Sequence, residues 1–540
     1  MKLFSKYFFI FFIVIVATSL RFYKLGDIPL SMNADEAAIG YNAYSILKTG
    51  KDEYGKLLPL SFRSFDDYKA PLYIYITSIS IAVFGLNNFS VRFVSALAGS
   101  ITVLLTYFMV QKMLLSRDSK IIPLFSALFL AISPWHLQFS RSAYEANVSV
   151  FFIVLGVILF YKGLQTRLPL VLSGISFVLS MWTYHTPRIF VPLLVCGLMI
   201  LYWKEIIQRK TDAIIAFIVS IILLLPLVFV LLSPTGLVRA RGISSLENPN
   251  ILKQSVRWIS DDRGGLLANI FHNRRIEYVR EIVKGYLAHF DPAFFFLDRA
   301  QSKYRAPGMG LLYLWELPFM IVGLYDLARR GKRWSAVLFL WVILAPVAAS
   351  PTLWLPHPVR TIVFLPALQV ITAFGVTCAI GWLLRRRLRV RYTGFGLIGM
   401  VIFTSFLYYF HQYYIHIPID GASDWQYGRQ QVVEEVKKRE SAYDRVVVST
   451  TLDQPQIFFL YYLKYDPARY LSEGGTISGK FDTQENHFAK YYFRSVAGDT
   501  SYVNQKTLYV STPAEMPTQA TQLADIQYPD GTIAFVLYEK

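Results

Sequence analysis

The sequence has 540 residues, of which 54% are hydrophobic and 16% aromatic, while only 17% are charged. Soluble domains carry roughly 25% charged residues, so this composition excludes an ordinary soluble enzyme and is typical of a polytopic membrane protein. The net charge of +18 does not indicate a nucleic-acid partner, because much of it falls in short loops between apolar segments. Cys196 and Cys378 lie inside hydrophobic segments, which supports neither a disulfide framework nor a cysteine-based metal site.

Eleven apolar segments are predicted to span the membrane. The first, residues 7–20, follows Lys2 and Lys6 and is interpreted as a span because no small-residue cleavage site of a signal peptide follows it. The others are residues 91–112, 121–138, 147–165, 168–185, 188–203, 211–232, 309–328, 334–350, 361–384 and 393–412. Alternate loops carry clusters of Lys and Arg, so the positive-inside rule places those loops and the N-terminus in the cytoplasm.

Residues 71–84 form one more apolar segment, but its length of about 14 residues suits a helix at the outer membrane surface better than a span. Parity favours this interpretation, because a span here, with the N-terminus inside, would move every later basic loop to the outside. A twelve-span model with the N-terminus outside is the alternative. That model would place Asp35 in the cytoplasm.

The eleven-span topology predicts two domains. Residues 1–414 form a mainly α-helical membrane domain with a first outer loop, 21–90, and a long outer loop, 233–308. Residues 415–540 form a small extracytoplasmic α/β domain, because runs 445–451, 507–511 and 531–538 are strand-like and residues near 430–440 are helical. The loop 233–308 is rich in arginine and aromatic residues, and it either lies on anionic headgroups and covers a site as a lid or is an ordinary solvated loop.

An adjacent acidic pair, Asp35 and Glu36, follows the first predicted span. Adjacent carboxylates repel each other, so a pair placed among apolar residues needs a cation, a proton or a basic partner. A structural explanation is also available, because Asn33 followed by two acids is a typical helix start, with an N-cap and charges that suit the helix dipole.

The predicted topology brings further polar residues to the same outer face. They are Asp66, Asp67 and Lys69 ahead of segment 71–84, Arg141 and Glu145 in the second outer turn, His185 and Arg188 in the third, and His357 and Arg360 before the tenth span. Each residue alone is also explained by a structural role, such as an interfacial arginine or a packed histidine. The functional inference therefore depends on their convergence on one face.

The convergent residue types predict a phosphate-linked substrate. Arginine and lysine suit phosphate oxygens, while carboxylates suit either a divalent cation that bridges to the phosphate or a base that takes a proton from a hydroxyl. No Walker or Rossmann glycine pattern is present, and nucleotide-activated donors are scarce outside the cytoplasm. The predicted donor is therefore a lipid phosphate.

Three motifs carry a family resemblance. They are Asp35-Glu36-Ala37, then Tyr68-Lys69-Ala70-Pro71-Leu72-Tyr73, and then Phe84-Gly-Leu-x-x-Phe-Ser-Val-Arg92-Phe93. Together they resemble the GT-C fold membrane glycosyltransferases, in particular the protein O-mannosyltransferases, the lipid A aminoarabinose transferases and their bacterial relatives. Ser133-Pro134-Trp135 with Arg141 and Glu145 resembles the second outer loop of that group, and the resemblance covers residues 1–415.

This resemblance implies an inverting glycosyltransferase. Such an enzyme moves a sugar from a polyprenyl-phosphate donor in the lipid bilayer to a hydroxyl of a protein, lipid or cell-envelope glycan on the outer face of the membrane. The roles that it implies are Asp35 as catalytic base, Glu36 as its helper, Glu145 as a second acid, and Lys69 as a contact of the donor phosphate. Arg188 and Arg360 are predicted as further contacts of the donor phosphate.

The resemblance leaves the need for a metal open. Tyr68 stands where the aminoarabinose transferases carry an acidic residue that holds a metal, so a divalent cation (Mg, Mn or Zn) is expected only through Asp66 and Asp67. Two other functions compete with a glycosyltransferase. A glycan flippase or transporter predicts ionisable residues at mid-membrane depth and internal repeats, which the sequence does not show. A non-enzymatic membrane sensor would leave the acidic residues unexplained.

Overall fold

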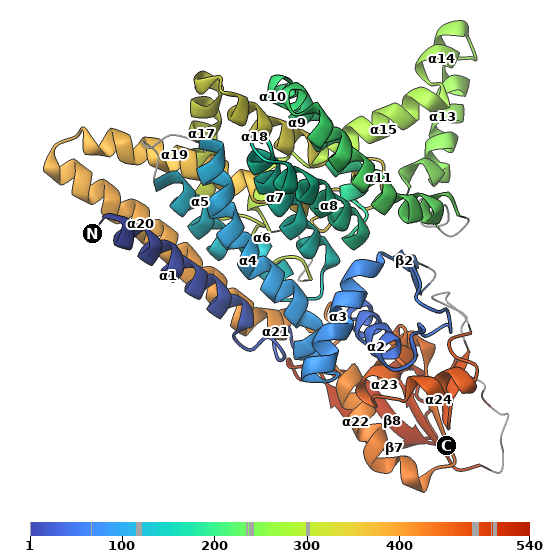
Figure 1. The fold of residues 1–540 in the computed structure, drawn as a ribbon. Coiled ribbons are helices and arrows are strands. Elements are labelled where there is room, and N and C mark those ends of the chain that lie inside the picture. The colour runs from blue at the N-terminus through green and yellow to red at the C-terminus, as the bar shows by residue number, and fades with distance from the viewer. Residues whose placement is uncertain are drawn as a thin grey trace.

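The computed structural model describes residues 2–65, 67–114, 121–233, 236, 242, 244–298, 303–477, 485–497, 499 and 505–540. It comprises a large helical bundle, a helical arm that projects from the bundle, and a mixed helix–sheet unit at the C-terminus (Figure 1).

Five helices in the described part of the chain are long and apolar enough to cross a membrane. They are α4 (Asn88–Leu114), α7 (Glu145–Gly163), α11 (Lys210–Leu232), α19 (Ala367–Leu384) with the preceding turn η2 (Ile362–Phe364), and α20 (Leu388–His411). A sixth span results if α5 (Ile121–Ile132) and α6 (Pro134–Ser140) are counted as one, although they meet at a bend of 57°. The bend falls at Pro134, because proline disfavours helical backbone in the residue before it.

Further helices fill the remaining predicted spans. They are α1 (Lys2–Phe22), α8 (Arg167–Thr183), α9 (Pro187–Leu201), followed by the short α10 (Trp203–Gln208), α17 (Glu316–Arg330) and α18 (Arg333–Leu344). The structure therefore confirms a mainly helical protein with five or six apolar spans, while the count of eleven stays a prediction.

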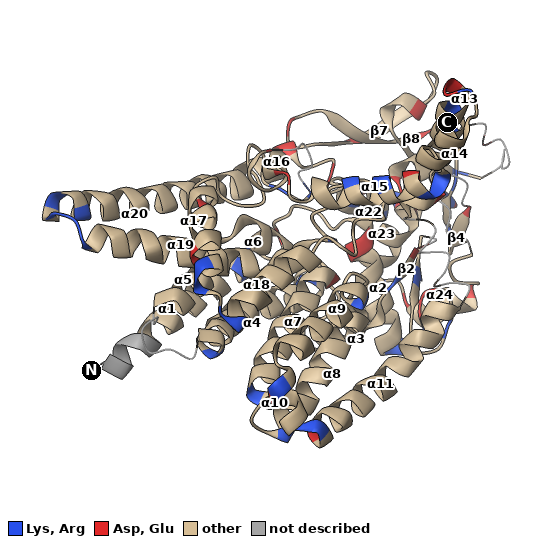
Figure 2. Cartoon of the chain, turned by 90° about the horizontal axis from the view of Figure 1, so that it is seen from above, with Lys and Arg blue, Asp and Glu red and all other residues tan. Residues whose placement is uncertain are grey.

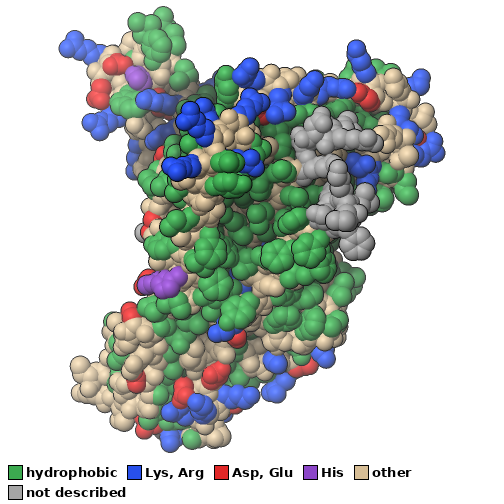
Figure 3. Space-filling model, turned by 90° about the vertical axis from the view of Figure 1, so that its left-hand side faces the viewer, with side chains coloured by type: hydrophobic (Ala, Val, Ile, Leu, Met, Phe, Trp, Pro, Cys, Tyr) green, Lys and Arg blue, Asp and Glu red, His purple; other side chains and the backbone are tan. Residues whose placement is uncertain are grey.

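The charged residues lie at the ends of these helices. Figure 2 shows Lys and Arg gathered around α10, at the start of α11 and at the turn between α19 and α20, while the middle parts of the helices carry almost no charge. Figure 3 shows a belt of hydrophobic side chains across the middle of one face, with charged side chains above and below it. This distribution is that of a protein whose middle lies in hydrocarbon.

One predicted span begins later than expected. Residues 309–315 are not helical, so the prediction of a helix over all of 309–328 is wrong for its first turns. The backbone of this segment is held in the core instead. Leu311 O accepts a hydrogen bond from Trp135 N (3.0 Å), and Leu312 N donates to Phe295 O (2.9 Å). These contacts with distant segments replace the hydrogen bonds that a helix would make.

The first outer loop forms α2 (Ala34–Thr49), the short strands β1 (Phe62–Ser64) and β2 (Asp67–Lys69), and α3 (Pro71–Phe84). The helix start predicted at Asn33 is confirmed, because the Asn33 side chain accepts from Glu36 N (3.1 Å) while Glu36 Oε2 accepts from Asn33 N (3.3 Å). This capping box satisfies two backbone donors at once. Helix α3 has the predicted bounds and packs against α2 and α4.

The C-terminal unit is a six-stranded sheet with helices on one face (Figure 1). The strands lie in the order β4-β5-β3-β6-β8-β7, with β5, β3 and β6 parallel and the other pairs antiparallel. They are β3 (Arg445–Val448), β4 (Asn486–Phe488), β5 (Tyr491–Phe493), β6 (Thr507–Ser511), β7 (Thr521–Gln527) and β8 (Ile533–Glu539). The predicted strand 445–451 is therefore too long, because residues 450–452 turn into the short helix η5 (Thr450–Leu452).

The C-terminal unit also contains several helices, two of which contact the first outer loop. They are α21 (Ile417–Asp420) after the turn η3 (Gln412–His416), α22 (Arg429–Arg439), α23 (Pro455–Tyr462) and α24 (Pro467–Ser472), with the turns η4 (Glu440–Ala442) and η6 (Pro513–Glu515). Helices α23 and α24 pack on α2. One hydrophobic core contains Ile39 of α2, Val446 of β3 and Phe458 of α23, all at most 1% exposed.

The arm consists of α13 (Pro249–Asp261), α14 (Leu266–Phe271) and α15 (Arg274–Ala288), between the turn η1 (Ser245–Glu247) and α16 (Pro292–Phe296). Figure 1 shows α13 and α14 projecting away from the bundle. Large apolar side chains are exposed along the arm, including Val256, Leu266 and Val279. Arg239 and Arg241, which belong to the same arginine-rich loop, lie outside the described residues.

Candidate active site

A cavity of about 610 Å³ lies between the bundle and the first outer loop. Its walls come from the start of α2, strand β2, the turns at 142–145, 184–189 and 348–360, the C-terminal end of α11, and Lys303 and Tyr304. The described site residues predicted from the sequence all line it: Asp35, Glu36, Asp67, Lys69, Glu145, Arg188 and Arg360. Asp66 falls outside the described residues.

Asp35 and Lys69 form an ion pair at the cavity wall. The Lys69 Nζ donates to Asp35 Oδ1 at 2.5 Å, and the Asp35 side chain is 59% exposed while that of Lys69 is 10% exposed. Burial lowers the pKa of the Lys69 ammonium, but Asp35 and Glu145 outweigh this effect, so the pKa lies above its ordinary value. A fixed positive charge therefore faces the cavity.

Glu36 lies behind Asp35 and is held from three sides. Its carboxylate accepts hydrogen bonds from Arg92 Nε and Nη2, both at 3.1 Å, and from Ala143 N at 2.9 Å. The fourth hydrogen bond that it accepts is the cap from Asn33 N. The side chains of Arg92 and Glu36 are 0% and 3% exposed. This buried pair ties the start of α2 to α4 and to the turn before α7.

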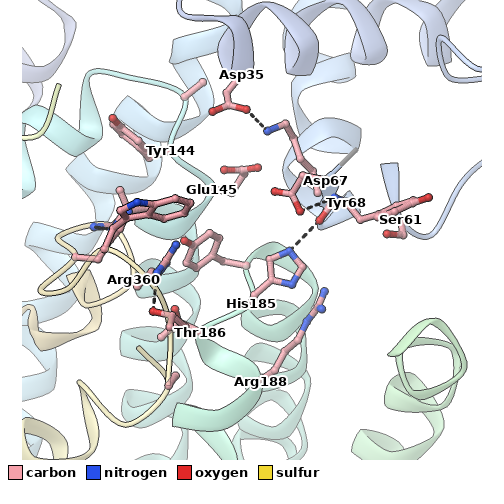
Figure 4. Close-up of a pocket in the computed structure, with 18 of the residues that line it drawn as sticks. Asp35, Ser61, Asp67, Tyr68, Tyr144, Glu145, His185, Thr186, Arg188 and Arg360 are labelled. Carbon is pink, nitrogen blue, oxygen red and sulfur yellow. Dashed lines mark hydrogen bonds and ion pairs between the residues drawn. The ribbon is translucent and has the colours of Figure 1, made fainter. Parts of the chain in front are cut away.

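The other acids of the cavity lie close to Lys69. Figure 4 shows Glu145 and Asp67 on the same side as Asp35. Asp67 Oδ1 accepts from Tyr68 N (2.8 Å), and the Tyr68 carbonyl accepts from His185 Nε2 (3.1 Å). Strand β2 is thereby tied to the third predicted outer turn, which places the acids and Lys69 opposite the arginines.

Two arginines approach the cavity from the other wall (Figure 4). Arg188 Nε donates to Met181 O (3.2 Å), and Arg360 Nη1 donates to Thr352 Oγ1 (2.6 Å) and Leu353 O (2.7 Å). These bonds fix each guanidinium at the cavity edge. The planar fork of a guanidinium matches the oxygens of a phosphate, so both side chains suit an anion in the cavity.

The histidines beside Arg360 do not add to its charge. Burial and the nearby Arg360 lower the pKa of His357 to about 3, and burial with a smaller effect of Arg360 lowers that of His289 to about 4. Both rings are therefore neutral at physiological pH. His289 Nε2 accepts a hydrogen bond from His357 N (3.2 Å), so this pair shapes the turn that carries Arg360.

Several cavity residues carry no signal in the sequence. Tyr304 lies with its ring 5.4 Å from that of His357, and burial together with Asp35 raises its pKa to about 12. Tyr144 donates to the carbonyl of Lys303 (3.3 Å). These aromatic side chains come from loops and turns, where no periodic pattern marks them, and they form a partly apolar wall that suits the face of a sugar.

The described residues do not by themselves form a divalent-cation site, and Asp66, one of the two predicted ligands, lies outside them. In the described part of the chain, no three His, Cys, Asp or Glu side chains form a group that would hold a metal. The Lys69 ammonium also lies where a cation next to Asp35 would bind. Asp67 alone is too small a ligand set for Mg, Mn or Zn, and no step proposed below uses a metal.

Comparison with known proteins relates these features to a family. The model of the family described as dolichyl-phosphate-mannose-protein mannosyltransferase matches residues 68–232. Two uncharacterized proteins of Aquifex aeolicus (strain VF5) are 29% identical over 150 residues and 30% identical over 149 residues, which is 28% and 27% of this chain. The matched stretches span about a third of the length of those two relatives (28% and 34%).

Solved structures show the same fold. ArnT from Cupriavidus metallidurans in the apo state matches 98% of this chain and 97% of its own, with a TM-score of 0.54 and 12% identity. The Archaeoglobus fulgidus oligosaccharyltransferase matches 85% of this chain and 63% of its own, with a TM-score of 0.53 and 13% identity. These findings confirm the predicted resemblance to the GT-C fold membrane glycosyltransferases and a multi-pass membrane protein.

Proposed function

We propose that this protein is an inverting glycosyltransferase that moves a sugar from a polyprenyl-phosphate donor to a hydroxyl acceptor at the outer face of the membrane. The observation that carries the proposal is the Asp35–Lys69 pair, 2.5 Å apart, at a cavity that two arginines also line. The fold supports it, because ArnT was solved bound to undecaprenyl phosphate and the archaeal enzyme with dolichol phosphate and an inhibitory peptide.

Lys69, Arg188 and Arg360 bind the phosphate of the donor. Their positive charges stabilise the negative charge that grows on the leaving phosphate as the bond to the sugar breaks. A phosphate monoester is a good leaving group, so the site needs no general acid. The neutral His357 and His289 leave Arg360 as the charged group of its turn.

Asp35 accepts the proton of the acceptor hydroxyl. In the structure its carboxylate accepts a hydrogen bond from the Lys69 ammonium. When the donor phosphate binds to Lys69, the ammonium interacts with both anions, and its interaction with Asp35 becomes weaker. The base is then available only when the donor is present, which disfavours loss of the sugar to water. The attack comes from the face opposite the phosphate, so the anomeric carbon inverts.

Replacement of Asp35 tests this role. We expect Asp35→Asn to lower transfer by more than about 100-fold, the usual scale for loss of a base, with normal yield and folding. The control is Asp27→Asn, an exposed acid in the same outer loop. Near-normal turnover of Asp35→Asn would exclude Asp35 as the base.

A donor panel identifies the sugar and the acceptor. Membranes with and without the protein are incubated with radiolabelled undecaprenyl-phosphate hexoses and pentoses, and label is measured in the protein, lipid and glycan fractions. We expect one donor to label one fraction only when the wild-type protein is present. If no donor gives protein-dependent labelling, the transferase function is wrong.

Eleven spans and a cytoplasmic N-terminus complete the proposal. Ala34 N donates to Gln426 Oε1 (2.6 Å), and Thr476 N donates to Glu53 O (3.1 Å). The first outer loop and the C-terminal unit are therefore on one side, which requires an even number of crossings between them. Ten predicted spans lie between them, and a crossing by α3 would make the number odd. This supports α3 at the surface; labelling of a cysteine at position 35 by an impermeant reagent from outside tests the orientation.

A further inference from the structure

We propose that Gln426 is a positioning residue through which the C-terminal unit holds the turn that carries Asp35. The inference depends on the proposed role of Asp35 as the base and adds a residue from the other predicted domain to the machinery. Gln426 lies in the segment between α21 and α22, far from the cavity residues in the sequence.

Two hydrogen bonds fix the Gln426 amide. Its Oε1 accepts from Ala34 N at 2.6 Å, and its Nε2 donates to Asp453 Oδ2 at 2.6 Å. A backbone N–H only donates and an ionised carboxylate only accepts, so the amide has one orientation that satisfies both partners. Ser31 Oγ donates to the Gln426 carbonyl at 3.3 Å, which ties the backbone of Gln426 to the same loop.

The backbone geometry of Gln426 and Asp453 indicates that the surrounding structure holds both residues in place. Gln426 and Asp453 have φ angles of +53° and +54°, in the left-handed region that costs a non-glycine residue free energy. Asp453 directly follows η5, the turn after β3, so the central parallel strand of the sheet fixes it. Strained residues persist where the surrounding structure holds them; here the two side chains contact each other, and Gln426 contacts the start of α2.

The contact reaches Asp35 through the first turn of α2. Ala34, Asp35 and Glu36 are the first three residues of this helix. Glu36 ties the turn to the bundle through Arg92 and Ala143, and Gln426 ties the preceding N–H to the C-terminal unit. The exposed Asp35 carboxylate thus lies on a turn clamped from both sides, and small displacements of a reacting group are costly to rate.

An exchange of the two polar partners tests the contact. Gln426→Glu places two carboxylates face to face, and we expect kcat to fall at least about tenfold while the donor KM changes less than about twofold. Asp453→Asn alone keeps an acceptor for the Gln426 amide, and we expect near-wild-type kcat. In the double variant the asparagine amide donates to the new carboxylate, which still accepts from Ala34 N–H, so we expect kcat to recover to within about threefold.

The matched control is the same exchange at Gln430 and Glu434. Gln430 Nε2 donates to Glu434 Oε1 (2.9 Å) on the exposed surface of α22, and we expect Gln430→Glu, with or without Glu434→Gln, to leave kcat unchanged. Transfer is measured with the panel of labelled undecaprenyl-phosphate sugars. Hydrogen exchange of the peptide 31–39 is measured in parallel, and we expect faster exchange in Gln426→Glu and recovery in the double variant.

The outcomes separate this inference from the proposed function. Full transfer by Asp35→Asn would overturn both. If Asp35→Asn is inactive but Gln426→Glu keeps wild-type kcat, only the positioning role is wrong. A loss in Gln426→Glu that Asp453→Asn does not restore also overturns it, because the loss would then not come from the contact between these two side chains.

Discussion

Replacement of Glu36 by glutamine separates the roles of the two adjacent acids. The Glu36 carboxylate accepts two hydrogen bonds from Arg92 and one each from Ala143 N and Asn33 N. The Arg92–Glu36 pair is almost completely buried, and removal of one partner of such a pair costs about 3–5 kcal/mol because the other charge is left unpaired. At about 2–4 °C per kcal/mol, we expect the melting temperature of Glu36→Gln to fall by at least about 6 °C.

Replacement of Asp35 by asparagine should leave the melting temperature unchanged and reduce transfer. The Asp35 side chain is 59% exposed, so water solvates its end of the ion pair, and its loss costs less than the loss of a fully buried partner. Glu145 also remains close to the Lys69 charge. We therefore expect Asp35→Asn to keep the wild-type melting temperature and lose transfer, because its effect lies in the chemistry.

The assay compares thermal unfolding in detergent with transfer per folded molecule. For Glu36→Gln we expect a lower melting temperature, with transfer reduced because the start of α2 shifts. A Glu36→Gln protein with the wild-type melting temperature and severely reduced transfer would refute this reasoning, and Glu36 would then act directly in the reaction.

Three further predictions concern other parts of the molecule. Burial raises the pKa of Glu53 to about 7 from 4.5, with a smaller rise from Asp52 and a decrease from Lys69; the folded state therefore holds a proton that the unfolded state has released. Stability should fall by up to about 3 kcal/mol as the pH rises from 4.5 to about 7 and then stay constant. Thermal unfolding at several pH values should show this fall in the wild type but not in Glu53→Gln. Arg360→Ala should raise the donor KM about 10- to 100-fold, as expected for a hydrogen bond to a charged group; a change in melting temperature alone would make Arg360 an anchor. A dye on Val256→Cys, in a variant without Cys196 and Cys378, should emit at shorter wavelength in anionic than in zwitterionic nanodiscs if the arm lies on headgroups, and equal emission would contradict this.

Local signals predicted much of the fold. The bounds of α3 follow from Pro71, which starts a helix well, and from Gly85, which ends it with a φ of +73°. Asn33 with Glu36 three residues later marked the start of α2. The convergence of Asp35, Lys69 and Arg360 on one face followed from topology, because alternation of basic loops fixes which turns share a side.

The features that the sequence did not predict depend on contacts between distant segments. In the sequence, only the family resemblance ranks Asp35 as the base and Glu36 as its helper. The pairing of Glu36 with Arg92, 56 residues away, shows which acid is buried and which is exposed, and no local pattern predicts it. The path of residues 309–315 depends on bonds to Trp135 and Phe295. Gln426 contacts Ala34 across 392 residues, and no local pattern distinguishes that glutamine from any other.

The C-terminal sheet gives this last contact a physical reason. In α/β domains the carboxyl ends of parallel strands form the edge where ligands bind. Here β5, β3 and β6 are parallel, and Asp453 follows β3 at that edge. Its carboxylate holds Gln426 against the start of α2. The edge that binds ligands in other α/β domains therefore supports, in this chain, the turn that carries the proposed base.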